Sequence, residues 1–247
     1  MNTKPHPFSL PFSHKEQVAK DTFAFYFDRV KRTFGHLEDW DFYPGQYIQM
    51  MLPNENSDNR GTMRYFTISS SPLDKKYLRV LTKVIQSTFK MTLAALKPGQ
   101  VVSFFGPNGD FYLREKKSEH VLLAGGIGMT PFISMLEYAT VKNLKNQITL
   151  FVAFSTPDEM IFFNQLIKIS DEHENINVIY TITKPSTVWT GETGRISSEL
   201  IKKNIIDVIK PLYYITGPPL MVEATVKMVQ EIGISEDQIF QEHFSGY

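Results

Sequence analysis

The sequence predicts a two-domain protein: an N-terminal antiparallel β-barrel with one short helix, then a C-terminal α/β domain built on a parallel sheet. Before Lys117, short apolar segments are separated by turn residues, a pattern typical of antiparallel sheets and barrels. After Lys117, apolar segments alternate with helical ones, which indicates a parallel sheet. A charged, non-periodic link near residues 114–119 sets the boundary, so the predicted domains are residues 1–116 and 117–247.

Composition limits the classes of function. The 247 residues are 42% hydrophobic, enough for real cores, and Lys plus Arg equals Asp plus Glu at 26 each. Such a balance gives no net charge to attract nucleic acid or anionic lipid. Cysteine is absent, which excludes disulfides, thiolate catalysis and cysteine-ligated clusters, and the six histidines show no metal-ligand spacing. We expect neither a metal site nor nucleic-acid binding.

The same composition bears on location. The first residues lack an apolar signal core, and the most apolar run, 121–136, is too short and too rich in glycine to span a bilayer. We therefore expect a cytoplasmic protein without membrane insertion.

The N-terminal half is expected to hold a series of strands and one helix. The strands are predicted at residues 23–27, 47–52, 65–69, 77–84 and 101–105. Ser87 is the predicted cap of a helix that runs to about Leu96, and residues 106–110 read as a turn.

The C-terminal half is expected to alternate strictly. Strands are predicted at residues 121–124, 148–154, 178–183, 212–216 and 239–242. Helices are predicted to start at Pro131, about Glu159, near Ser197 and at Pro219.

One strand carries side chains that suggest chemistry. Arg64, Tyr65, Phe66 and Thr67 bring a cation, two rings and a hydroxyl together on a segment that Pro72 ends. Strands rich in such residues are common, so this motif needs support from the rest of the chain. Lys90 gives some, because a cation in the first turn of a helix is disfavoured by the helix dipole unless an anion is also bound. The alternative is that Lys90 simply reaches into solvent.

A glycine-rich loop follows the first strand of the C-terminal half. Gly125, Gly126 and Gly128 come directly before Thr130, a predicted N-cap, and Pro131, a predicted first helical residue. Pro131 takes the place of the third glycine of a G-x-G-x-x-G loop. The strand, the glycines and the helix start together favour a dinucleotide-binding loop over a purely structural turn.

A second glycine turn follows a later strand. Thr216, Gly217 and Pro218 precede a helix whose apolar stripe reads as core. Since ligands of open α/β sheets bind over the carboxyl ends of the strands, the two turns predict one cleft.

Over nearly its whole length the chain resembles the ferredoxin-NADP reductase superfamily. Arg64, Phe66 and Thr67 match the family motif R-x-Y-[ST], with Phe in place of Tyr, and Ser87, Phe89 and Lys90 match its second flavin segment. The G-G-x-G-x-T-P loop is matched by Gly125, Gly126, Gly128, Thr130 and Pro131. Gly217, Pro218 and Met221 match C-G-P-x-x-M, and Glu242 to Phe244 match E-x-F.

The resemblance implies roles for these residues. Arg64 and Lys90 would meet the FAD diphosphate, Phe66 would stack on the isoalloxazine, and Thr67 would bond near flavin N5. Glu242 would lie near the nicotinamide and relay a proton. Either Phe244 or Tyr247 would cover the second flavin face until the nicotinamide arrives.

Two positions depart from the family pattern. Thr216 stands where the family has a cysteine beside the nicotinamide, and Ser155 stands where relatives that use NADPH often carry an arginine. Lys184 or Arg195 could pair with a 2'-phosphate instead, so the choice between NADH and NADPH stays open.

The function that the resemblance implies is that of an FAD-dependent NAD(P)H oxidoreductase. Hydride would pass from NAD(P)H to FAD, and electrons would go on to a separate acceptor: a redox partner protein such as a ferredoxin, a flavodoxin or an oxygenase component, or a small molecule. The alternative is a non-catalytic dinucleotide-binding electron-transfer or regulatory subunit. The acceptor and the oligomeric state stay open.

The motif on the first strand makes one geometric demand. Regular alternation places Arg64 and Phe66 on one side of a strand and Thr67 on the other. For all three to contact one flavin, either alternation fails at Thr67 or the flavin lies across the end of the strand.

Overall fold

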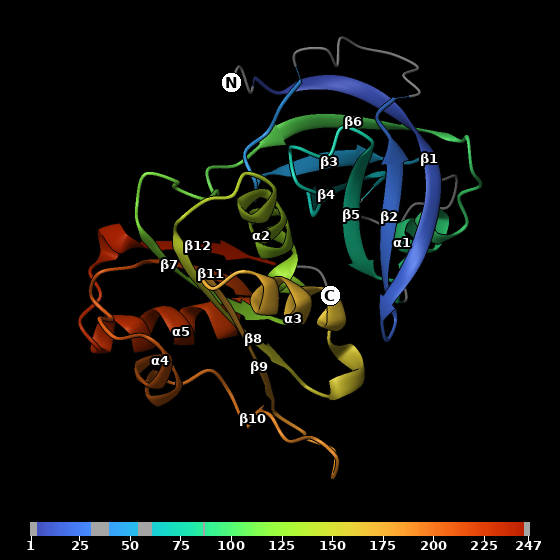
Figure 1. The fold of residues 1–247 in the computed structure, drawn as a ribbon. Helices are drawn as coiled ribbons and strands as arrows, with labels where there is room; N and C mark the ends of the chain where they lie inside the picture. Colours follow the sequence, from blue (N-terminus) through green and yellow to red (C-terminus); the bar gives the residue numbers. More distant parts are fainter. Residues whose placement is uncertain (1–3, 31–39, 54–60, 86, 245–247) are drawn as a thin grey trace. The chain divides into compact units, whose positions relative to one another are not determined.

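The computed structural model describes residues 4–30, 40–53, 61–85 and 87–244. By their internal contacts these residues form two units (Figure 1). The first holds residues up to Leu113 together with Thr130–Val141, and the second holds Arg114–Met129 and everything from Lys142 onward. Each unit is described by itself.

The first unit is an antiparallel barrel. Its strands are β1 (His6–Ala19), β2 (Thr22–Asp28), β3 (Tyr47–Met51), β4 (Met63–Thr67), β5 (Tyr77–Lys83) and β6 (Val101–Asn108). They pair in the order β4-β3-β6-β1-β2-β5, and a bridge between Ile68 and Val80 joins the two edges. Two helices belong to this unit, α1 (Thr88–Ala94) and α2 (Thr130–Val141).

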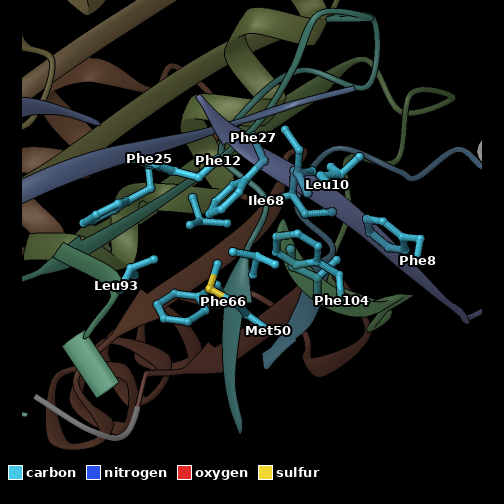
Figure 2. Packing of buried hydrophobic residues seen from close by; sticks show 14 of the residues in the cluster. Phe8, Leu10, Phe12, Phe25, Phe27, Met50, Phe66, Ile68, Leu93 and Phe104 are labelled. Carbon is cyan, nitrogen blue, oxygen red and sulfur yellow. The ribbon is translucent and has the colours of Figure 1, made fainter. Parts of the chain in front are cut away.

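Aromatic side chains fill the interior of the barrel. Figure 2 shows rings and aliphatic groups from several strands pointing toward one another, with Phe66 and Ile68 among them. Phe8, Phe27 and Phe104 form a run of ring contacts with centroids 5.0 to 5.3 Å apart. Burial of this apolar surface is what holds six short strands together.

The second unit is a parallel sheet. Its strands are β7 (Glu119–Gly125), β8 (Gln147–Phe154), β9 (Ile176–Ile182), β10 (Glu192–Thr193), β11 (Leu212–Gly217) and β12 (Ile239–His243), in the order β10-β9-β8-β7-β11-β12. The helices are α3 (Phe163–Glu172), α4 (Ser198–Asn204) and α5 (Pro219–Glu231), with 3-10 turns at Gly126–Met129, Pro157–Glu159 and Glu236–Gln238. Residues of α4 and α5 share a core cluster with one face of the sheet.

The predicted fold class is confirmed: an antiparallel barrel comes first and a parallel α/β sheet second. Three local predictions were wrong. Strand β6 continues through residues 106–108, where a turn was expected, and α3 starts at Phe163 rather than near Glu159. Helix α2 starts at Thr130 directly after a 3-10 turn, so Thr130 is its first residue and not its N-cap. The predicted boundary between residues 116 and 117 stays a prediction.

Candidate nucleotide and flavin sites

The end of β4 carries the first set of predicted site residues. Pairing with β3 places Tyr65 opposite Gln49 and Phe66 opposite Ile48, so the two rings point to opposite faces. Tyr65 is 68% exposed, whereas Phe66 is 8% exposed and lies in the barrel core. The face of the strand that carries Tyr65 also carries Thr67, which is buried.

Arg64, Phe66 and Thr67 could contact one flavin only if alternation fails at Thr67 or the flavin lies across the end of the strand, so the path of the chain after Thr67 matters. Regular pairing of β4 ends at Thr67, after which Ile68 donates to the carbonyl of Gln46 at 2.9 Å and Ser69 donates to that of Arg79 at 2.8 Å. Ile68 thus bonds to the residue just before β3 while it also bridges to Val80 of β5, and from Ser69 the chain follows β5. A ligand that lies across the end of β4 would reach both faces of the strand there.

The guanidinium of Arg64 lies beside the start of α1. Its Cζ is 5.2 Å from the centre of the Phe89 ring, and its Nη1 donates to the carbonyls of Gly61 at 2.9 Å and Met63 at 2.7 Å. Ser87 caps α1 as predicted, since its hydroxyl accepts from the backbone N–H of Lys90. The first turn of α1, Thr88 to Met91, contains the cation Lys90 and no carboxylate. This donor set fits a diphosphate group.

Phe66 and Phe89 pack on each other, which bears on a predicted role. Their ring centres are 5.9 Å apart at 29°, and both belong to the hydrophobic core cluster of the barrel. This burial argues against a flavin stacked flat on Phe66. The ring that β4 presents to solvent is Tyr65.

In the second unit the glycine loop leaves β7 in a compact turn. Gly126 has φ +54°, a conformation that glycine adopts without cost, and a side chain there would meet open space. At Gly128 the opposite holds, because a Cβ would lie 2.7 Å from the Cα of Gly217. The two glycine turns predicted to share a cleft therefore touch each other.

Thr216 joins the same two turns. It is fully buried, and its hydroxyl donates to the carbonyl of Gly128. The backbone N–H of Phe244 donates to the carbonyl of Gly217 at 3.0 Å, which brings the tail to the same place. Thr216 thus stabilises the loop through its side chain. Sequence reasoning did not find this role, since the two residues lie 88 positions apart.

Glu242 lies beside Thr216 on the neighbouring strand, β12. Its Oε2 is buried and has no hydrogen-bond partner among the described residues. Burial raises the pKa of this carboxyl to about 7. A carboxyl with such a pKa can give or take a proton near neutral pH.

The remaining predicted residues fall on the same elements. Gly125, Gly217 and Pro218 surround Met221, whose Sδ would lie 3.2 Å from a Cβ at Gly125 and 2.8 Å from one at Gly217. Pro131 is buried in the first turn of α2. Tyr247 lies outside the described residues.

The turn after β8 holds a carboxylate, Asp158, that sequence reasoning did not single out. Ser155 is exposed, and its carbonyl accepts from the backbone N–H of Lys184 at 2.8 Å. Thr156 donates to the carboxylate of Asp158 in the same turn. A carboxylate at the carboxyl end of a strand is the group that binds a ribose diol and repels a 2'-phosphate.

Comparison with known proteins fits both units. Residues 9–112 match the model of an oxidoreductase FAD-binding domain, and residues 122–227 match that of an oxidoreductase NAD-binding domain. The chain belongs to the ferredoxin-NADP reductase superfamily. The predicted cofactors, FAD and a nicotinamide dinucleotide, are the ligands of the matched superfamily domains.

Relatives in this superfamily cover most of the chain. An NADH-cytochrome b5 reductase-like protein of Arabidopsis thaliana is 29% identical over 76% of the chain and 62% of its own length. The anthranilate 1,2-dioxygenase electron transfer component of Acinetobacter baylyi is 26% identical over 85% of the chain and 60% of its own. The chain spans about three fifths of the length of these relatives.

Solved structures of the superfamily share the fold. The CS-b5R domains of human Ncb5or, in an NAD+ form, superpose with a TM-score of 0.81 at 25% identity, covering 97% of the chain and 70% of that structure. The FAD/NAD-binding domain of a Vibrio cholerae nitric oxide dioxygenase superposes with a TM-score of 0.83 at 22% identity, covering 96% and 98%.

Two kinds of feature are absent from the described residues. None of the helices there has the length and apolar character needed to cross a bilayer. Within the same residues, no three His, Asp or Glu side chains gather as metal ligands would.

Proposed function

We propose that the protein is an FAD-dependent NAD(P)H oxidoreductase that passes electrons to a separate acceptor. The observation that carries the proposal is that each unit holds its own set of groups for an anionic nucleotide. Bound FAD supplies the redox chemistry, accepting hydride from NAD(P)H and releasing electrons to the acceptor. The chain's own residues would bind and orient the two nucleotides and move the protons.

In the first unit, Arg64 and the start of α1 would hold the FAD diphosphate. The contact of Arg64 with Phe89 at the start of α1, and its hydrogen bonds to two backbone carbonyls, support this role. Thr67 sits where β4 ends, so its hydroxyl would face the flavin N5 edge. Tyr65 supplies an exposed ring beside it.

In the second unit, the glycine loop would hold the dinucleotide diphosphate on backbone N–H groups. Glu242 would hold a proton at Oε2 beside the nicotinamide, where burial keeps its pKa near neutral. Phe244 or Tyr247 would shield the flavin before the nucleotide binds.

The acceptor is proposed from chemistry and from relatives. These 247 residues hold no cysteine for an iron-sulfur cluster, so electrons would leave the flavin for an acceptor outside this sequence. Relatives are named as an NADH-cytochrome b5 reductase-like protein and as a dioxygenase electron transfer component, which favours a cytochrome or an oxygenase component as the acceptor. The cytoplasmic location expected from the composition stays part of this proposal.

Thr67→Val tests the site directly. The hydroxyl near N5 is lost while the shape is kept, so we expect flavin reduction by NADH to slow about tenfold in stopped-flow measurements. Thr82→Val, which removes another buried threonine hydroxyl of the barrel, is the control. Equal rates for wild type and Thr67→Val would remove Thr67 from the mechanism. A protein that binds FAD but is reduced by neither nucleotide would favour the non-catalytic alternative.

A further inference from the structure

Within the first unit, Arg79, a buried cation on β5, connects the segment that follows β4 to α2. Arg79 is 7% exposed. Its Nε donates to the hydroxyl of Ser69 at 3.0 Å, and its Nη2 donates to the carbonyl of Ser69 and to Oε1 of Glu137, both at 2.7 Å. Glu137 lies on α2, and its side chain is 17% exposed.

A second contact joins the same two segments as the ion pair. Ser134, one turn earlier on α2, donates to the carbonyl of Ser70 at 2.7 Å. The hydroxyl of Ser70 accepts in turn from the backbone N–H of Arg79 at 3.1 Å. Ser69, Ser70, Arg79, Ser134 and Glu137 are called the latch below.

The latch is charged in the folded protein. Burial lowers the pKa of the Arg79 guanidinium, but Glu137 and Tyr26 raise it, and the net shift is upward. A buried ion pair of this kind fixes geometry more than it adds stability, because both charges have lost most of their water. Moving one partner out of place would remove the ion pair while the other charge stays largely buried.

Along the chain, two parts of the latch adjoin segments to which the proposed function assigns ligands. The serine run starts at Ser69, two residues after Thr67 at the end of β4, and α2 continues directly from the glycine loop. The chain passes from the second unit to the first between Met129 and Thr130. Whatever holds α2 on the barrel therefore also restrains the loop that precedes it.

We infer that Arg79 and Glu137 are positioning residues for hydride transfer. By holding α2 against the segment that follows β4, they restrain the start of α2 and the glycine loop that directly precedes it in the chain. This inference rests on the proposed function. Hydride transfer requires near-contact distances, so a displacement of about 1 Å is costly.

Glu137→Gln in the full-length chain tests the inference. The amide keeps the size and one oxygen acceptor but removes the charge that pairs with Arg79. Ser134→Ala is a milder second variant if Glu137→Gln folds poorly. Glu115→Gln, which removes the exposed pair with Lys142 at 2.7 Å, is the control.

Two measurements are made on each variant. Amide hydrogen exchange of Gly125–Met129 and of α2 is recorded without added nucleotide. Flavin reduction is then followed by stopped flow over a range of NADH concentrations, to separate the NADH dissociation constant from the limiting rate. FAD content is measured on the same samples.

We expect exchange to accelerate about tenfold in both α2 and the loop of Glu137→Gln. The limiting rate should fall about tenfold while FAD content stays at the wild-type value and the NADH dissociation constant changes less. Faster exchange confined to α2, or an unchanged limiting rate, would overturn the inference and leave a purely structural ion pair. If wild type binds no FAD, the proposed function fails, whereas the exchange result still reports on the latch.

Discussion

A single hydroxyl accounts for the most informative departure from the family motif. Thr216 replaces a cysteine, yet its side chain is directed to the carbonyl of Gly128 and is fully buried. The residue therefore braces the nucleotide loop rather than presenting a reactive group. No pattern in the sequence could have shown this, because the acceptor is a backbone oxygen from a distant turn.

Thr216→Val should lower the free energy of unfolding by about 2 kcal/mol, because the buried carbonyl of Gly128 loses its donor. NADH binding should weaken as well, since the loop is freed. Thr225→Val is the control: its hydroxyl donates to the carbonyl of Met221 at 2.8 Å within α5, so its loss should cost less. Urea titration and NADH titration measure the two effects. Equal costs for both variants would show that Thr216 is an ordinary buried threonine.

The role that the resemblance implies for Phe66 can be tested against the position of its ring. The family motif assigns a flavin-stacking ring to this position, but strand geometry places the ring in the core and Tyr65 outside. Phe66→Ala should lower the free energy of unfolding of the FAD-free protein by about 3 kcal/mol, and Tyr65→Ala by less than about 0.5 kcal/mol. A cost for Phe66→Ala that appears only with FAD bound would instead support stacking on the flavin.

At the level of elements, periodicity located most strands and helices but missed β1. Phe8, Leu10 and Phe12 alternate as buried residues in this strand, so a signal was present. Two prolines and a charged run from His14 to Gln17 obscured it. Tertiary pairing tolerates both, because β1 pairs with β6 through its first half and with β2 through its second half.

The start of α3 was misplaced for a related reason. Pro157, Asp158 and Glu159 read as a helix start, since proline and carboxylates favour the first turn. They form a 3-10 turn instead, and the helix begins after Phe162, which has φ +49°. The carboxylates of this short turn are thus left at the carboxyl end of β8.

That turn predicts a preference for NADH. Asp158, held by the hydroxyl of Thr156, would bind a ribose diol and repel a 2'-phosphate. Asp158→Ser should lower the ratio of kcat/KM for NADH over NADPH about tenfold. Asp171→Asn, an exposed change on α3, should leave the ratio unchanged. A wild-type preference for NADPH would contradict this account and favour Lys184 or Arg195 as phosphate ligands.

At the level of the whole molecule, two buried groups of the second unit oppose each other in pH dependence. Burial lowers the pKa of His120 from 6.5 to about 4, so between these values the unfolded chain binds more protons and stability falls as pH falls. Burial raises the pKa of Glu242 from 4.5 to about 7, so over that range the folded chain binds more protons and stability falls as pH rises. The two slopes cancel in part.

Single variants should separate the two slopes. Relative to wild type, Glu242→Gln should become more stable as pH rises from about 4.5 to 7, by up to about 3 kcal/mol. His120→Gln should become relatively more stable as pH falls from about 6.5 to 4, by a similar amount. Urea titrations across this range measure both trends. Parallel pH profiles for the three proteins would show that neither group is shifted in the folded state.

The sequence predicted the fold class and the superfamily, because the periodicity of the two halves and the order and spacing of several short motifs agree. It could not predict which groups in those segments touch. The contact between Gly128 and Gly217, the buried oxygen of Glu242 and the latch around Arg79 all depend on packing between distant segments.

The central claim is that this chain binds FAD and that NADH or NADPH reduces the bound flavin. Anaerobic titration of the purified, FAD-loaded protein with each nucleotide, followed by flavin absorbance, tests it most directly. We predict that an equimolar amount of NADH bleaches the flavin, and that NADPH does so more slowly. A protein that takes up no FAD, or a bound flavin that neither nucleotide bleaches, would contradict the account.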